Sequence, residues 1–223
     1  MSTRIKKCVN CGKKQPSEGL KFERNTDGYT VSGIGTCADI DLIIPELHNG
    51  LPVNAIGNQA FRHLSSLQSV VIPDTVISIG RQAFQNCTGL KSIEIPDSVT
   101  YIDSFAFCQC SNLTSITISK NITQIGSNVF SYCSNLTSIN IPDGVICLDG
   151  RAFAYCENIT SVYLPGSLTE IADGVFSDSH NLTDFYFGGT YEQWIGVQKG
   201  TNWLPATINY TIHCIDGDYK AYE

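Results

Sequence analysis

The chain has 223 residues, of which 42% are hydrophobic, and its formal net charge is −7. Nucleic acid is a poor candidate partner for such an acidic chain, because nucleic acid is held mainly through its negatively charged phosphates. No stretch reaches the roughly 18 consecutive apolar residues of a membrane span, so we expect no membrane insertion.

The N-terminal segment, residues 1–19, is a polar tail without the apolar core and cleavage site of a secretory signal. The sequence as written therefore predicts a cytoplasmic protein, and a trimmed sequence would fit a cell-surface or secreted one. Within the tail, Cys8 and Cys11 have the spacing of half a tetrahedral zinc site, with Cys37 and His48 as the nearest further ligands. The alternatives are a redox pair and two exposed thiols. No other cofactor is expected.

Residues 20–57 predict an N-terminal cap and an irregular first coil. Two short alternating runs, residues 20–23 and 29–32, flank the turn-forming cluster 25–28, which indicates a β-hairpin. Residues 41–45 then match a strand that recurs later, and residues 46–52 make a longer loop than later copies have. Capping units of repeat proteins are commonly irregular in this way.

Residues 58–187 consist of a repeat with a period of 23 residues. One phenylalanine marks each copy, and we call these residues the repeat phenylalanines: Phe61, Phe84, Phe107, Phe130, Phe153 and Phe176. A copy this short cannot bury its own apolar face, so the copies must stack into a solenoid. Apolar residues six, nine and eleven places later, such as Leu90, Ile93 and Ile95, predict a strand that points both isoleucines into the core.

The repeat phenylalanine stands in an Ala-Phe-x-x-Cys segment in three copies, at Phe84, Phe107 and Phe153. This one-turn spacing predicts a short helix. The expected fold class is an α/β solenoid with a parallel sheet on one face and short helices on the other. The cysteine position is filled by Leu64 in the first copy, which predicts an apolar slot of free, buried thiols at Cys87, Cys110, Cys133 and Cys156.

Residues 188–223 predict a C-terminal cap and tail. A helical run around Trp194 precedes a final strand that ends at Ile212, and the large aromatic residues would cover the end of the stack. Residues from Asp216 onward are expected to be frayed.

The repeat unit Ile-Gly-x-x-Ala-Phe-x-x-Cys-x-x-Leu-x-Ser-Ile-x-Ile-Pro resembles the BspA-type leucine-rich repeat. The entry at residues 50–53 and the exit at residues 188–194 are similar to that family's end caps. The resemblance covers about residues 20–212 and implies a right-handed leucine-rich-repeat superhelix of bacterial type. It also implies a role in cell adhesion, because several family members are surface proteins.

No catalytic group of residues is evident, so we expect no enzyme. The four histidines stand at different repeat positions, and none recurs beside a nucleophile or carboxylate. The outward strand position between the two inward isoleucines varies, and this variation indicates recognition. The candidate binding residues at this position are Glu94, Thr117, Asn140, Tyr163 and Tyr186. The alternative is a solvated face whose tyrosines only pack beside the cap.

The leading interpretation is therefore a non-enzymatic protein–protein interaction module, because a solenoid offers an extended surface to a protein partner. The sequence does not identify that partner or indicate an oligomeric state. The alternative is a bacterial surface adhesin that binds a host matrix protein or glycan, which the family resemblance implies.

Overall fold

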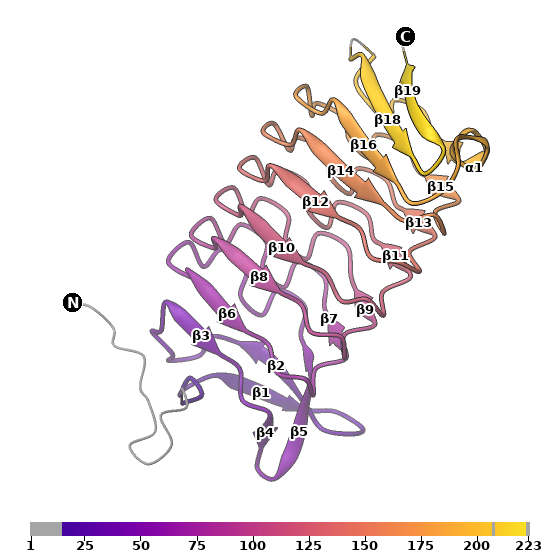
Figure 1. Ribbon diagram of the computed structural model, residues 1–223. Helices are drawn as coiled ribbons and strands as arrows, with labels where there is room; N and C mark the ends of the chain where they lie inside the picture. Colours follow the sequence, from indigo (N-terminus) through magenta and orange to yellow (C-terminus); the bar gives the residue numbers. More distant parts are fainter. Residues whose placement is uncertain (1–14, 207, 222–223) are drawn as a thin grey trace.

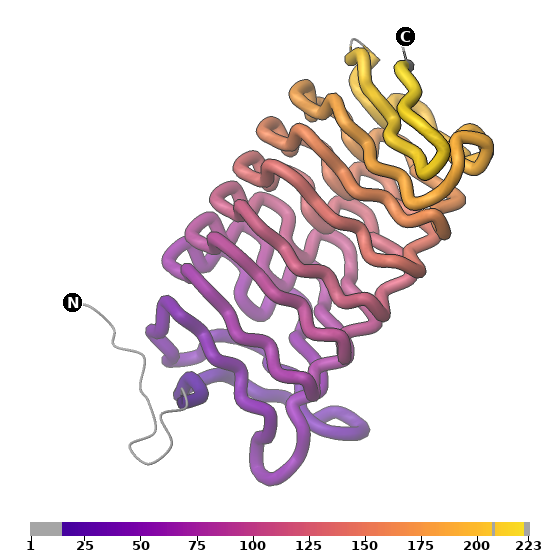
Figure 2. The backbone as a smooth tube through the Cα atoms, viewed as in Figure 1, coloured from indigo at the N-terminus to yellow at the C-terminus, as the bar shows by residue number. Residues whose placement is uncertain are grey.

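The computed structural model describes residues 15–206 and 208–221, so the proposed zinc ligands Cys8 and Cys11 lie outside the described residues. The chain winds as a stack of coils into one elongated body, with β1 (Lys21–Arg24) at one end and β19 (Gly217–Ala221) at the other (Figures 1 and 2). Residues 23 apart lie side by side in neighbouring coils, as the pairing of Ser92 with Ser115 shows. The handedness of the superhelix stays a prediction.

One side of each coil is a short parallel strand, as the sequence predicts (Figure 1). Within β8, Ile93 is buried, and the following Ile95 is buried too, whereas Glu94 between them is exposed. Ile116 is an exception, because it is only partly buried against the core. We call the outward surface of these strands the strand face. Its strands are β3 (Asp41–Ile43), β6 (Ser69–Val71), β8 (Ser92–Glu94), β10 (Ser115–Thr117), β12 (Ser138–Asn140), β14 (Ser161–Leu164), β16 (Asp184–Phe187) and β18 (Tyr210–Cys214).

A second and narrower set of parallel strands follows the turn after each strand of the strand face. In β9 this strand has only two residues, of which Ile102 is buried and Tyr101 is exposed. These short strands begin the return path of each coil, and we call them the narrow sheet. They are β5 (Leu51–Ile56), β7 (Ser78–Ile79), β9 (Tyr101–Ile102), β11 (Gln124–Ile125), β13 (Cys147–Leu148), β15 (Glu170–Ile171) and β17 (Gln198–Lys199).

The prediction of short helices on the other face is wrong, because the segments around the repeat phenylalanines are successive tight turns. The amide of Phe84 donates to the carbonyl of Ala106 in the next coil at 2.8 Å. The amide of Ala83 instead donates to Gly80, three residues back, at 3.2 Å. Backbone donors thus alternate between the two coils, whereas an α-helix directs all of them four residues back. We call this side the turn side.

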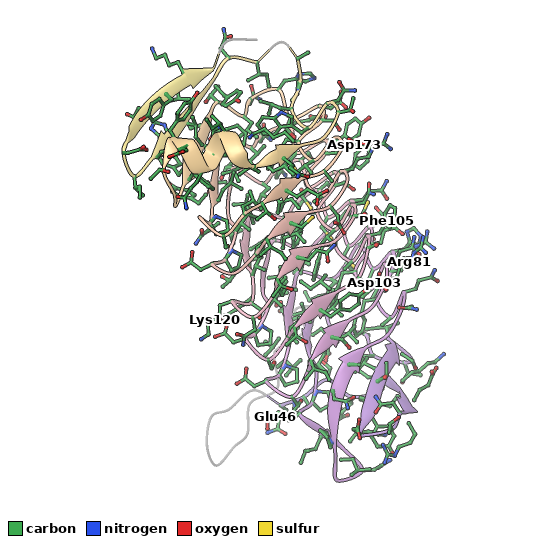
Figure 3. All side chains as sticks on the ribbon, turned by 90° about the vertical axis from the view of Figure 1, so that its right-hand side faces the viewer. Glu46, Arg81, Asp103, Phe105, Lys120 and Asp173 are labelled. Carbon is green, nitrogen blue, oxygen red and sulfur yellow. The ribbon has the colours of Figure 1, made fainter. Side chains whose placement is uncertain are left out.

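Left-handed backbone residues set the shape of the turn side. Two residues before and two residues after Phe84, the φ angles of Gln82 and Asn86 are +59° and +60°. Such values interrupt a right-handed helix. Figure 3 shows the edge where the turn side begins, marked by the labelled Arg81, Phe105 and Asp173.

The repeat phenylalanines form one continuous ladder through the core. Phe107 is fully buried and stacks on Phe84 and Phe130, with ring centroids 5.2 and 5.5 Å apart. Consecutive rings along the whole ladder are 5.2 to 5.7 Å apart. Each ring therefore completes the core of its neighbours, which is why a single copy cannot be stable alone.

The repeated cysteines are buried and free, and their slot is not simply apolar. The thiol of Cys133 donates to the carbonyl of Phe107 in the preceding coil at 3.4 Å, and Ser179 makes the same bond to Phe153 at 3.2 Å. The slot thus holds a small buried donor in five copies: Cys87, Cys110, Cys133, Cys156 and Ser179. Burial raises the pKa of Cys87 and Cys156 to about 12.

At the N-terminal end, the expected hairpin is present, because β1 pairs antiparallel with β2 (Tyr29–Gly33). Strand β2 then pairs in parallel with β5, so the hairpin continues the narrow sheet. The longer loop, residues 46–52, contains β4 (Leu47–His48), which pairs back on β5. His48 stacks on Phe22 at 3.9 Å between ring centroids, so it packs against the hairpin.

At the C-terminal end, α1 (Tyr191–Gly196) is the only helix among residues 15–206 and 208–221, and it is not long enough to cross a membrane. Trp194 and Trp203 are buried over the last coil, 6.0 Å apart between ring centroids. The prediction that residues from Asp216 onward are frayed is wrong for residues 216–221. Gly217, with φ +143°, allows a tight turn, and β19 then pairs antiparallel with β18.

Candidate binding surface on the strand face

The five predicted binding residues lie in one exposed column on the strand face. Strand pairing places Thr117 beside Glu94 and Tyr163 beside Asn140. Tyr186 follows in the next coil, paired with Tyr163. The parallel register brings these residues together because each stands at the same place in its repeat. The arrangement predicted from the sequence is therefore the arrangement in the structure, while its role in binding stays a prediction.

Tyr163 and Tyr186 form a stacked pair. Their ring centroids are 4.6 Å apart and the rings are 12° from parallel. Each ring keeps much of its surface in solvent, with exposed fractions of 44% for Tyr163 and 37% for Tyr186. Each ring limits the rotamers of the other, so the pair offers aromatic area that is already ordered.

His213 extends this stack and was not singled out by the sequence analysis. Its ring lies 4.5 Å from that of Tyr186 and 13° from parallel. Strand β18 places it there by pairing His213 with Tyr186. The two residues are 27 positions apart instead of 23, because the cap inserts extra residues. The alternating residues up to Ile212 indicate a strand that could have placed His213 on the strand face. The 23-residue period is broken before this strand, so the repeat position of His213 could not be read from the sequence.

Two carboxylates hold the His213 ring. Its Nε2 lies 3.0 Å from Asp184 and its Nδ1 lies 2.8 Å from Asp218. Both nitrogens must carry a proton to donate to both acceptors, which favours the imidazolium form. The hydrogen bond to Asp184, aided by Asp218, therefore raises the pKa of His213 above its usual 6.5. In turn, the hydrogen bond from His213 lowers the pKa of Asp184 below 3.8.

A column of small serines runs beside the candidate residues. Ser92, Ser115, Ser138 and Ser161 occupy the outward position two residues earlier in their strands. Asp41 accepts a 2.6 Å hydrogen bond from Ser69 at one end of this column. The side chains are short, so the stack of Tyr163, Tyr186 and His213 stands above a shallow polar surface. This stack is the most distinctive feature of the strand face.

The other described histidines have separate surroundings. His63 faces Asn86 at 2.9 Å, and His180 lies 3.9 Å from Asp178 at an exposed site. Within the described ranges, no three His, Cys, Asp or Glu side chains gather to hold a metal ion. Cys37 and His48, the nearest remaining candidates beside the predicted ligands Cys8 and Cys11, do not join such a group among the described residues.

Six copies of the BspA type leucine rich repeat region match residues 54–183. The chain belongs to this BspA-type leucine-rich repeat family. The family resemblance stated from the repeat motif is thus confirmed, and no catalytic family is indicated. No curated protein matches the chain.

Solved structures of bacterial leucine-rich repeat proteins are similar to this BspA-type chain. One is a leucine-rich repeat protein of T. pallidum, with 29% identity and a TM-score of 0.76 over 85% of this chain and 87% of that one. Another is a leucine-rich cell surface protein of Faecalibacterium prausnitzii, with 28% identity and a TM-score of 0.59 over 81% of this chain and 41% of that one. A protein of Eubacterium ventriosum, at 22% identity, shares the fold with a TM-score of 0.64 over 85% and 50% of the two chains.

Proposed function

We propose that this BspA-type protein is a non-enzymatic interaction module whose strand face binds a protein partner. The observation that carries the proposal is the ordered stack of Tyr163, Tyr186 and His213 on an otherwise shallow polar face. Tyrosine gives large contact area at low entropic cost and dominates many binding hot spots. A solenoid adds an extended surface on which one partner can contact several coils.

The footprint of the partner would extend from the tyrosines toward the N-terminal coils. Asn140, Thr117 and Glu94 follow in that order along the strand face and are all exposed. Their side chains can hydrogen-bond but bury little apolar area. We therefore expect the tyrosines to supply most of the affinity and these three residues to supply specificity.

Affinity capture from cells that express the protein tests this proposal. The bait pair is the wild type and a Tyr163→Ala/Tyr186→Ala variant, and Tyr101→Ala is the matched control. Tyr101 is 57% exposed but lies on the narrow sheet, away from the strand face. We expect the wild type and the Tyr101→Ala control to retain a partner that the double variant loses. The affinity of the double variant for this partner should be at least tenfold weaker. Equal retention by all three baits would falsify the assignment to the strand face.

A second candidate is a surface adhesin for a host matrix protein or glycan. It is favoured by the family and by the cell surface protein of Faecalibacterium prausnitzii that this chain resembles. Labelling of intact and permeabilised cells with an antibody separates it from a cytoplasmic module. Signal on intact cells supports the adhesin, and signal only after permeabilisation supports the cytoplasmic protein that the sequence predicts.

A further inference from the structure

We propose that a groove on the turn side binds a linear, neutral oligosaccharide. The groove has a volume of about 290 Å³ and lies on a different side of the coil from the strand face. Its two walls are the residues two and four places after the repeat phenylalanines of four consecutive coils. The position between the walls is the buried cysteine slot, so the groove runs along the axis of the stack above Cys87, Cys110, Cys133 and Cys156.

The first wall ends in a second tyrosine pair. Tyr132 and Tyr155 stack with ring centroids 4.3 Å apart and planes 5° from parallel, and Tyr132 is 44% exposed. Both residues have left-handed backbones, with φ of +61° and +60°. A bulky residue is unusual there, and the same position holds an ordinary Asn86 two coils before Tyr132. All copies share this backbone, with φ of +58° to +64° also at His63, Asn86, Gln109 and Asp178, so the angle alone does not distinguish the tyrosines. A left-handed backbone does not favour aromatic residues, so it does not explain the exposed stacked pair.

The remaining lining is polar and almost uncharged. Asn86 and Gln109 continue the tyrosine wall, and the facing wall carries hydroxyls from Thr88, Ser111 and Ser134. Glu157 is the only charged residue that lines the groove, so the lining contains no cation. Amide and hydroxyl groups can both donate and accept hydrogen bonds. These groups can hydrogen-bond to sugar hydroxyls, and the tyrosine rings can pack against the C–H faces of pyranose rings. The surface is therefore suited to a neutral sugar.

The spacing of the walls favours a sugar chain over a peptide. On the turn side, the repeat phenylalanines of these four coils are 5.2 to 5.5 Å apart between ring centroids, so the groove repeats its polar groups at about that interval. One sugar unit of an extended glycan has a similar length, so each coil can contact one unit. An extended peptide rises about 3.3 Å per residue and repeats its side chains every second residue, which does not match the coils.

The groove continues past Tyr155 into a second hollow of about 520 Å³. Tyr155 lines both, and the second hollow is also lined by Arg151, Asp178 and Asn202. The negative charge of Asp178 raises the pKa of Tyr155 above its usual 10. The groove itself has Glu157 and no cation to pair with a sulfated or uronic acid chain, which is why we assign a neutral ligand.

The test is isothermal titration calorimetry of the full protein with neutral linear hexasaccharides of glucose, mannose and N-acetylglucosamine. A heparin hexasaccharide is the acidic probe. The variant is Tyr132→Asn/Tyr155→Asn, because asparagine tolerates the left-handed backbone and keeps the turns folded. The matched control is Tyr101→Asn on β9, because Tyr101 is 57% exposed and lines neither the groove nor the strand face.

We expect at least one neutral hexasaccharide to bind, at least tenfold more weakly to the turn-side variant, and equally to wild type and control. Binding of none of the neutral probes at millimolar concentration overturns the inference. So does preference for heparin, or a loss of affinity in the Tyr101→Asn control alone. The inference does not rest on the protein-binding proposal, because the two test variants change different tyrosines.

Discussion

The molecule carries two stacked tyrosine pairs of nearly the same ring geometry on two different backbones. Tyr163 and Tyr186 stand on paired extended strands, 4.6 Å apart. Tyr132 and Tyr155 stand on left-handed turns, 4.3 Å apart. Extended strands favour aromatic residues, whereas a left-handed backbone penalises them. The strand pair therefore agrees with its local structure, and the turn pair opposes it.

The two stacks also end differently. The strand pair continues into His213, which is held by two carboxylates. The turn pair continues toward Asp178, which raises the pKa of Tyr155. The first stack thus ends in an imidazole whose pKa is raised by the carboxylates that hold it, and the second ends at a carboxylate. Stability measurements on matched variants can separate these two regions.

The largest effect is expected in the core, where one coil can be weakened from either side. Phe107→Ala removes a fully buried ring from the turn side and should cost about 3–5 kcal/mol of unfolding free energy. Ile116→Ala, in the strand of the same coil, should cost less, about 1–2 kcal/mol, because Ile116 is only partly buried. Urea denaturation followed by circular dichroism measures both.

Thr117→Ala is the control for these core variants, because Thr117 is exposed in the same strand as Ile116 and should change stability by less than about 0.5 kcal/mol. If Phe107→Ala unfolds at the wild-type urea concentration, the phenylalanine ladder is not in the register described. If Ile116→Ala costs more than Phe107→Ala, the strand side holds the tighter part of this coil.

Strict periodicity is what made the fold predictable from the sequence. The phenylalanine ladder and the outward column from Glu94 to Tyr186 follow from one spacing. The turns did not, because the Ala-Phe-x-x-Cys spacing fits a helical turn and two successive tight turns equally well. The deciding bonds, such as that from Phe84 to Ala106, join separate coils and have no local signature.

The sites outside the period were harder to predict for the same reason. His213 reaches Tyr186 across an insertion, and β19 depends on a turn at Gly217 that the repeat does not contain. Tyr132 and Tyr155 stand at a position filled by different residue types in other copies. Their sequence signal was two aromatic residues 23 apart, and only the structure shows that the two rings stack beside a groove.

The next effect compares the two tyrosine pairs directly. Tyr163→Asn loses ring stacking and strand propensity, so it should cost about 1–2 kcal/mol. Tyr132→Asn loses similar stacking but relieves a left-handed backbone that costs most residues about 1–2 kcal/mol. The two terms nearly cancel, and we expect a change of about 0 kcal/mol. Thermal denaturation of both variants beside the wild type measures the difference.

This comparison can fail in an informative way. If Tyr132→Asn destabilises the protein as much as Tyr163→Asn, the turn pair contributes to stability and its backbone cost is small. The turn-side rings would then have a structural role that needs no ligand. Tyr132→Ala separates the stacking energy from the backbone cost. Alanine also lacks the ring, but it does not tolerate the left-handed backbone as asparagine does.

The smallest effect is a pH dependence that only the strand-face stack should show. The raised pKa of His213 gives stability that is complete below pH 6.5 and is lost as the pH rises through its folded value. The lowered pKa of Asp184 gives stability that is present above pH 3.8 and is lost as the pH falls through its folded value. The pair therefore stabilises most between these limits, near pH 5.

His213→Gln should accordingly lower the melting temperature more at pH 5 than at pH 9, by the equivalent of about 1 kcal/mol or less, because solvent screens the pair. Lys120→Gln is the control. It breaks the exposed ion pair with Asp97, 2.6 Å apart, and a lysine–aspartate pair does not titrate between these pH values. The small effect of Lys120→Gln on the melting temperature should be the same at pH 5 and pH 9. If His213→Gln also acts equally at pH 5 and pH 9, the imidazole is held neutral, and only the strand and stacking contacts of His213 contribute.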